Sequence, residues 1–276
     1  MANTKKDEMS FLQHLEILRW HLVRSTIAIL AFAIVCFIGK EIIFDVIIFG
    51  PKQPGFPTYQ FFCEMSRSLG ITEIFCLDKM PFEILNTKMA GQFATHIWVS
   101  LIAGFILAFP YVIFEVWRFI KPGLKSTEKK YSGGVIFFAS ILFLLGVLFG
   151  YYLITPLSVQ FLGTYSISGE VENLIDLNSY ITMVSMITLS TGLVFELPII
   201  VYFLAKVGML TPSWMRTYRR HAFVVTLILS AVITPPDLAS QILVSMPILV
   251  LYEISIKICA RVVKNNRKKE LALQSK

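Results

Sequence analysis

Charged side chains are scarce in this sequence. Asp, Glu, Lys and Arg make up 16% of its 276 residues, whereas a soluble globular domain carries about a quarter. Hydrophobic residues make up 55% and include 23 Phe. A chain of this composition can bury its apolar surface only in lipid, which excludes an arrangement of soluble domains. The composition therefore predicts one membrane domain over residues 1–276.

Sequence motifs of catalysis and cofactor binding are also missing. The chain has no phosphate-binding loop, no Gly-x-Ser-x-Gly string and no evident pair of Asp residues in two apolar runs. These absences argue against an ATPase and an intramembrane protease. The four His are scattered without metal-ligand spacing. We therefore expect no enzymatic activity, no cofactor and no metal site.

The basic residues indicate membrane topology. A net charge of +7 would suit a nucleic-acid partner, but the Lys and Arg lie in short clusters beside apolar runs, so we expect no nucleic-acid binding. With the N-terminus in the cytosol, 20 of the 25 Lys and Arg lie on the cytosolic side, as the positive-inside rule requires. Both termini are therefore predicted to be cytosolic.

Six apolar runs predict an all-α polytopic membrane protein with six transmembrane helices. The third run is expected to end before Pro156. The fifth has 16 residues, or about 24 Å of helix, against a hydrocarbon core of about 30 Å. The sixth is also brief, and short final spans should thin the bilayer or tilt their neighbours. The predicted spans cover residues 22–38, 93–117, 135–155, 180–204, 221–236 and 238–256.

Two further segments are predicted outside the spans. Residues 10–21 are expected to form an amphipathic helix on the inner leaflet, because apolar residues recur there at alternating spacings of four and three. Residues 40–92 are expected to form a structured outer loop, because Pro and Gly residues prevent a continuous helix. The residues concerned are Phe11, Leu15, Leu18 and Leu22 in the first segment and Pro51, Pro54, Gly55 and Pro57 in the second.

The four cysteines divide into two groups. Cys63 and Cys76 both fall in the outer loop, where an oxidising compartment makes a disulfide plausible. Whether they pair depends on their separation in space, which the sequence leaves open. Cys36 and Cys259 lie in or near predicted spans and are expected to be free thiols.

Glu196 lies inside the predicted fourth span, away from both basic loops. An unpaired ionised group at that depth costs several kcal/mol, so Glu196 is protonated, faces a wet cavity or has a partner. Pro198 should kink the helix just beyond it. We hypothesise that Glu196 faces a water-accessible concave pocket that contacts a partner or substrate. A structural hydrogen bond within the bundle is the alternative.

Four strings, in chain order, resemble the TatC family. They are His14–Arg19 (HLEILR), Val116–Leu124 (VWRFIKPGL) with Glu128, Phe195–Pro198 (FELP), and Thr234–Asp237 (TPPD) with Ser240 and Gln241. The resemblance covers nearly the whole chain, from Phe11 to about Arg261. It implies a concave six-span bundle in the bacterial inner (plasma) membrane. It also implies a receptor for twin-arginine signal peptides that joins TatA/TatB-type single-span proteins in an oligomeric, lipid-embedded complex. Such complexes export folded proteins, driven by the proton-motive force.

The resemblance also assigns the signal-peptide site. Glu128 matches the family's loop glutamate, which suits an arginine pair because a carboxylate and a guanidinium form bidentate hydrogen bonds. Phe119 matches a family position tied to signal-peptide binding, and Arg19 lies in the family's N-terminal motif. Family members commonly carry Glu at the position of Ile17, whereas this chain carries Glu16, about 100° around a helix. Either Glu16 faces solvent, or the helix rotates and Glu16 takes over the contact.

The last matching string predicts a structural tip between the final two spans. Pro235, Pro236, Asp237 and Gln241 should shape this tip, with Asp237 capping the start of span six. Glu253 is expected to pair with Lys257 four residues on. A secondary transporter of a small solute is the alternative function, since it would also combine several spans with an intramembrane carboxylate. It predicts internal repeats, and none is evident.

Overall fold

The structure is a computed structural model and is almost entirely helical. It describes residues 11–68, 70, 76, 80, 82–120, 132–168, 170, 173–234 and 238–274. The chain divides into two compact units, and each is described by itself. The first comprises residues 1–38 and 100–140, and the second comprises residues 39–99 and 141–276.

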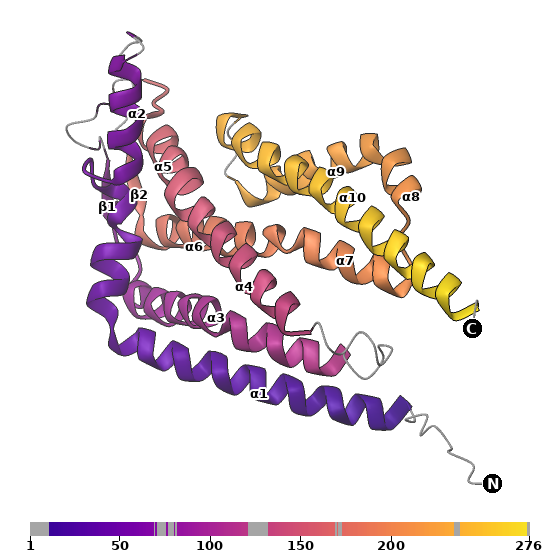
Figure 1. Cartoon of the computed structure of the whole chain (residues 1–276). Coiled ribbons are helices and arrows are strands. Elements are labelled where there is room, and N and C mark those ends of the chain that lie inside the picture. The colour runs from indigo at the N-terminus through magenta and orange to yellow at the C-terminus, as the bar shows by residue number, and fades with distance from the viewer. Residues whose placement is uncertain are drawn as a thin grey trace. The chain divides into compact units, whose positions relative to one another are not determined.

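The first unit is built on two long helices, α1 (Phe11–Ile38) and the later part of α3 (Gly91–Ile120), which run side by side (Figure 1). Gly104 permits their close approach, because a Cβ at this position would lie 2.6 Å from the backbone nitrogen of Ala33. Small residues allow helix backbones to pack closely in a membrane protein. Ala33 and Cys36 are buried along α1.

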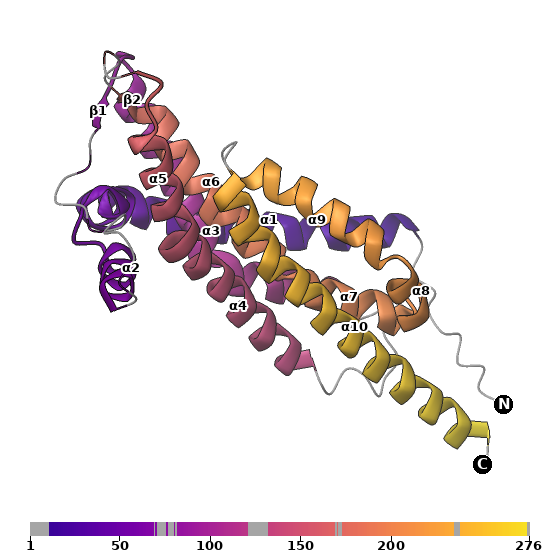
Figure 2. The ribbon, with the colours of Figure 1, turned by 90° about the horizontal axis from the view of Figure 1, so that it is seen from above.

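The second unit holds the remaining helices and a two-stranded sheet. α10 packs against α7, and α9 and α10 lie side by side (Figure 2). The helix α4 (Ser132–Phe149) is divided between the two units, with its residues up to Ser140 in the first and those from Ile141 in the second. The other elements, in chain order, are η1 (Ile42–Ile48), η2 (Gly50–Lys52), α2 (Pro57–Ser68), β1 (Glu83–Leu85), η5 (Gly150–Ile154), α5 (Thr155–Thr164), β2 (Leu174–Asp176), α6 (Leu177–Phe195), α7 (Leu197–Val207), α8 (Pro212–Thr217), α9 (Arg219–Ile233) and α10 (Leu238–Gln274).

The predicted outer loop folds onto the ends of the long helices. The Tyr59 hydroxyl lies 2.8 Å from the carbonyl oxygens of both Pro51 and Pro156. The Tyr180 hydroxyl donates to the carbonyl of Ile48 at 2.9 Å. Tyr59 is 1% exposed, and burial raises the pKa of its hydroxyl. These buried phenols join the outer loop to α5 and α6 through hydrogen bonds to backbone carbonyls.

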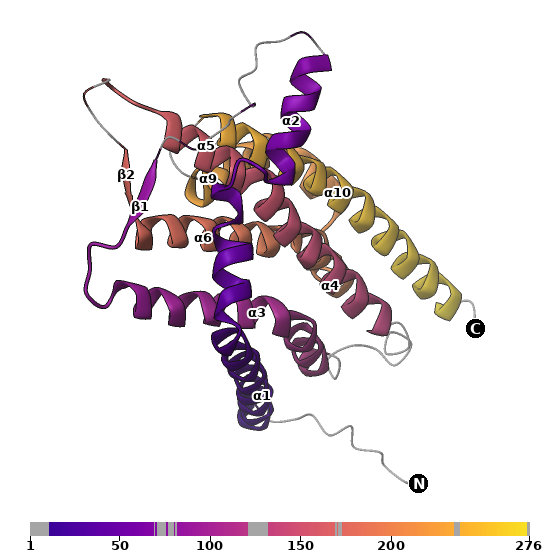
Figure 3. The ribbon, with the colours of Figure 1, turned by 90° about the vertical axis from the view of Figure 1, so that its left-hand side faces the viewer.

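The strands β1 and β2 pair in parallel and tie the outer loop to the segment before α6 (Figure 3). Glu83 is paired with Leu174, and Leu85 with Asp176. The Asp176 carboxylate then caps α6 by accepting from the backbone N–H groups of Asn178 and Ser179. It also accepts from the Thr87 hydroxyl at 2.8 Å. One carboxylate therefore joins both strands to the start of a long helix.

The stability of this junction should depend on pH. The Thr87 hydroxyl, the Ser179 and Asn178 amides and nearby Lys88 hold the pKa of Asp176 below its usual value. A lowered pKa in the folded state stabilises the protein above the unfolded pKa, and this contribution is lost as the pH falls through the folded value. Between about pH 5 and pH 3, the melting temperature of the wild type should fall more than that of Asp176→Asn.

The matched control for this prediction is Asp45→Asn, at an exposed Asp in η1. Its melting temperature should fall with pH as the wild type's does. Parallel pH profiles for Asp176→Asn and the wild type would contradict the role of Asp176.

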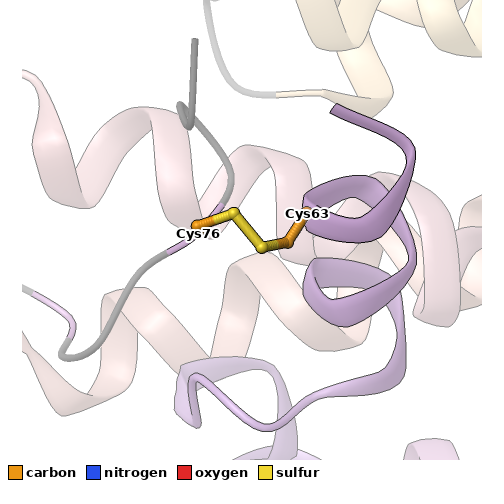
Figure 4. Close-up of a disulfide and its surroundings, with 2 residues drawn as sticks. All are labelled: Cys63 and Cys76. Atoms are coloured by element: carbon orange, nitrogen blue, oxygen red, sulfur yellow. A yellow bond between two sulfur atoms is a disulfide. The ribbon is translucent and has the colours of Figure 1, made fainter. Parts of the chain in front are cut away.

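A disulfide joins Cys63 of α2 to Cys76 (Figure 4). Their Cα atoms are 4.9 Å apart, and 13 positions separate them in sequence. A link that closes a loop of this size stabilises a fold by about 3 kcal/mol in the chain-entropy account. Cys36 and Cys259 are buried free thiols.

Counting reactive thiols tests this pairing. In denaturant without reductant, a thiol-reactive polyethylene glycol should add to two cysteines, and after reduction to all four, because only Cys36 and Cys259 start as thiols. Cys63→Ser should give three additions without reductant, since it releases Cys76. Four additions to unreduced wild type would show that the disulfide is absent.

A glycine seam joins α4 and η5 to α6 within the second unit. A Cβ at Gly146 would lie 2.8 Å from the Thr191 carbonyl oxygen and from the Phe195 side chain. A Cβ at Gly150 would lie 3.1 Å from the Ile187 carbonyl oxygen. Gly146 and Gly150 form a Gly-x-x-x-Gly pair, the spacing that brings membrane helices into backbone contact.

Within the described residues, five helical stretches are long and apolar enough to cross a membrane: Leu15–Ile38, Gly91–Ile120, Gly134–Thr164, Leu177–Val207 and Ser240–Lys268. The predicted fifth span corresponds to α9, which has 15 residues. The first stretch lies within one continuous helix, so no break separates a surface helix at residue 21 from a span at residue 22. The helix of the predicted sixth span is not brief, since α10 runs for 37 residues. Its basic residues from Lys257 onward are good helix formers and do not end it.

The prediction that Pro156 ends the third helix is wrong. The π-helical turn η5 interrupts the α-helix just before it, and Pro156 occupies the first turn of α5, which continues to Thr164. Proline is tolerated in a first turn because its missing N–H has no intrahelical partner to lose.

Candidate functional site

A buried carboxylate lies between α1 and α3 in the first unit. Glu115 is 1% exposed and contacts Nδ1 of His21. Its Oε1 accepts from the Tyr111 hydroxyl at 3.0 Å and lies 3.6 Å from Nη1 of Arg118. The carboxylate thus has a ring nitrogen, a hydroxyl and a guanidinium around it, which is the condition for holding a charge in a buried place.

Sequence reasoning missed this cluster. It treated His21 as one of four scattered His and gave Glu115 no role. The spacing carried a signal, because Tyr111 lies four residues before Glu115 and Arg118 three residues after it. Such spacings place side chains on one helix face. The partner on the other helix, His21, is visible only in the structure.

Three of the predicted signal-peptide residues lie within the described part of the first unit. Phe119 is half-buried, and its ring meets the His21 ring edge to face, with centroids 6.3 Å apart. Glu16 and Arg19 are exposed on α1, whereas Ile17 is half-buried. His21 therefore contacts both Glu115 and Phe119 and lies little more than one turn beyond Glu16. Glu128 lies outside the described residues.

Glu196 lies where the predicted fourth span breaks. It ends α6 and precedes α7, with Pro198 in the first turn of α7. The predicted kink at Pro198 is therefore matched by a break between two helices. Glu196 is 7% exposed, so its carboxyl is buried rather than open to solvent. Its Oε1 has no hydrogen-bond partner within the part of the chain that the structure describes. Within the described residues, this buried oxygen is therefore left unsatisfied.

The predicted tip is only partly described. Gln241 of α10 donates from Nε2 to the Leu227 carbonyl of α9 at 3.2 Å, so it joins the last two helices. Pro235, Pro236 and Asp237 lie outside the described residues. The prediction that Glu253 pairs with Lys257 is wrong. Glu253 instead forms an ion pair with Arg219 of α9, with 2.7 Å between Oε2 and Nη2. A contact across the helix pair replaces one along a single helix.

No group of three or more His, Cys, Asp and Glu suited to a metal ion occurs among the described residues.

These features define a class: a multi-pass helical membrane protein with apolar helices, buried carboxyl groups within them and a folded loop at their ends. Residues 13–247 match the family model for the Sec-independent protein translocase protein TatC. The chain belongs to the TatC family of protein translocase subunits.

Relatives and solved structures agree with this assignment. The TatC protein of Blattabacterium sp. subsp. Periplaneta americana is 41% identical over 92% of this chain and 96% of its own length. TatCy of Bacillus subtilis is 30% identical over 99% of this chain and 97% of its own. A crystal structure of the twin-arginine translocase receptor TatC in DDM matches with a TM-score of 0.71 at 30% identity, covering 89% of this chain and 98% of that one. A second TatC receptor crystal structure matches with a TM-score of 0.68 at 29% identity, covering 89% and 97%.

Proposed function

We propose that this chain is the receptor subunit of a twin-arginine export system. It binds signal peptides that carry two adjacent arginines and works with TatA/TatB-type single-span proteins. The complex moves folded proteins across the inner membrane by using the proton-motive force. The match to two TatC receptor structures over 89% of the chain carries this proposal. Family membership favours protein translocation over transport of a small solute.

The proposed topology has six spans and both termini in the cytosol. It combines the five long apolar helices with α9, which at 15 residues is about 22 Å long. The charge distribution supports it, since 20 of the 25 Lys and Arg then lie in cytosolic segments. The disulfide and the β1–β2 pair would then lie on the outer face, where disulfides persist.

The signal peptide binds, in this proposal, at the cytosolic ends of α1 and α3. Glu128 and Glu16 supply carboxylates for the two arginines, because a desolvated guanidinium needs a bidentate acceptor. Glu16 is exposed and open to a ligand, whereas Ile17 is half-buried. Phe119 packs against the apolar part of the peptide, and Arg19 lies on the same stretch of helix. His21 and Glu115 hold α1 against α3 beneath this site.

Glu196 serves, in this proposal, as a second contact point within the membrane. Its Oε1 is buried and has no partner within the described residues, and leaving a buried polar atom unsatisfied is costly. A polar group from a partner subunit or from the cargo would satisfy it.

Export of a folded reporter tests the function. In a strain that lacks its own receptor, the wild-type chain should restore export of a reporter with an Arg-Arg leader but not with a Lys-Lys leader. Glu128→Ala should reduce export about tenfold or more, since a charge-assisted hydrogen bond is lost. Glu196→Leu should impair export without preventing insertion.

The register of the N-terminal acid is tested in the same strain. Glu16→Ala should weaken export, and Glu16→Ala/Ile17→Glu should restore it if the acid works best at the family's position. Immunoblots of the membrane fraction control for chain level. Equal export of the Arg-Arg and Lys-Lys reporters would overturn the receptor assignment.

A further inference from the structure

An open pocket of about 750 Å³ lies in the second unit, and none of the residues proposed to bind the signal peptide lines it. Its lining contains both polar and apolar side chains. It combines two lysines, three primary amides, a histidine and a hydroxyl with six aromatic and aliphatic side chains. The polar residues are Lys40, Lys52, Gln53, Asn86, Gln92, Thr95 and His96, and the apolar ones are Phe44, Phe49, Ile84, Phe93, Leu177 and Ile181.

The charge of this pocket has one sign. Lys40 is exposed, and Lys52 is half-buried with its Nζ 5.8 Å from the centre of the Phe82 ring. No Asp or Glu occurs among the described residues that line the pocket. Ammonium groups and amide N–H groups all donate hydrogen bonds, so together they suit an anion with several oxygen acceptors.

The apolar wall shows that the ligand is more than an anion. Ile181 is fully buried at the wall, and the Phe44 ring meets the His96 ring edge to face at 5.5 Å. Phe93 is 63% exposed and leaves a large apolar surface beside the lysines. A small hydrophilic anion would use the polar part and leave this surface uncovered, whereas an amphiphile covers both.

The pocket also lies at the ends of apolar helices. Lys40 follows the first candidate span by two residues, and Gln92 to His96 occupy the first turns of the second. Leu177 and Ile181 begin the fourth candidate span. Helix ends of this kind lie at the depth of lipid headgroups, where an ammonium group can form a charge-assisted hydrogen bond to a lipid phosphate.

We propose that this pocket binds an anionic phospholipid. Its phosphate lies between Lys40 and Lys52 and accepts from the neighbouring amides, and its acyl chain runs along Phe44 and Phe93. The site requires only that the chain be embedded in a membrane, so it stands independently of the proposed receptor function.

Native mass spectrometry of the full-length protein in detergent tests the site. With added dioleoyl-phosphatidylglycerol, the wild type should retain one lipid more strongly than with dioleoyl-phosphatidylcholine. Lys40→Gln and Lys52→Gln should each weaken retention of the anionic lipid about fivefold. Lys88→Gln removes the same charge from an exposed position outside the pocket and should bind as the wild type does.

One further variant and a competition experiment distinguish a lipid from other ligands. Gln92→Trp keeps both lysines but puts a large ring at an exposed lining position, so it should weaken retention of both lipids even if Lys52→Gln does not fold. Excess inorganic phosphate or an acidic peptide should not displace the lipid. Displacement by either would assign the pocket to a free anion or to a peptide. Equal retention by the wild type and Lys40→Gln/Lys52→Gln would overturn the proposal.

Discussion

Glu115→Ala should lower the free energy of unfolding by about 3–5 kcal/mol, the range for breaking a buried ion pair by removing one partner. The change leaves His21 without its carboxylate and the Tyr111 hydroxyl without its acceptor, and it opens a cavity between α1 and α3. Denaturant or thermal unfolding of the purified protein in detergent measures the loss. Because Phe119 contacts His21, the same variant should also weaken signal-peptide binding.

A double-mutant cycle separates the interaction energy of His21 and Glu115 from the other costs of truncating each side chain. His21→Ala and Glu115→Ala should be strongly non-additive, since each removes the other's partner. Glu16→Ala, an exposed Glu on the same pair of helices, should change the stability by no more than about 0.5 kcal/mol. Additive losses for the two truncations would show that His21 and Glu115 do not interact.

Gly146→Leu should destabilise the second unit by about 3 kcal/mol, at the upper end of the range for overpacking. The new Cβ would lie 2.8 Å from the Thr191 carbonyl oxygen, and a backbone atom cannot turn aside as a side chain does. The two helices must therefore separate and lose contact along the seam from Gly146 to Gly150. Thermal unfolding and the yield of folded protein on gel filtration measure the effect.

Gly134→Leu is the matched control for this change. It makes the same substitution in the same helix, at an exposed position with no described atom within 4 Å of the added Cβ. It should leave the melting temperature within about 2 °C of the wild-type value. Equal destabilisation by both variants would mean that Leu disfavours the helix itself and that the seam is not tightly packed.

The sequence predicted most of the helices because long apolar runs leave few alternatives in a membrane. It also predicted the folded outer loop and the break beside Pro198, since proline acts locally. It failed at Pro156 because a π-helical turn, which has no clear sequence signal, changed what proline does there. Local rules thus succeeded for the apolar runs and for Pro198, but not at Pro156.

Contacts between helices were beyond the same rules. The spacing of Glu253 and Lys257 favoured a pair along one helix, yet α9 brings Arg219 to Glu253. The candidate site shows the same limit, because His21 and Glu115 come from different helices and neither belongs to the strings that carried the resemblance. Glu16 and Phe119 were named from those strings. His21, the α1 residue whose ring contacts Phe119, was not.

The parallel pairing of β1 with β2 sets an order of events during synthesis. Three-residue strands are too short to persist alone, so β1 waits unpaired until β2 has left the ribosome. By then α3, α4 and α5 have already been made, and Asp176 arrives together with the strand that it anchors. Until that moment Glu83–Leu85 has an open backbone edge, the kind of edge to which another strand can add.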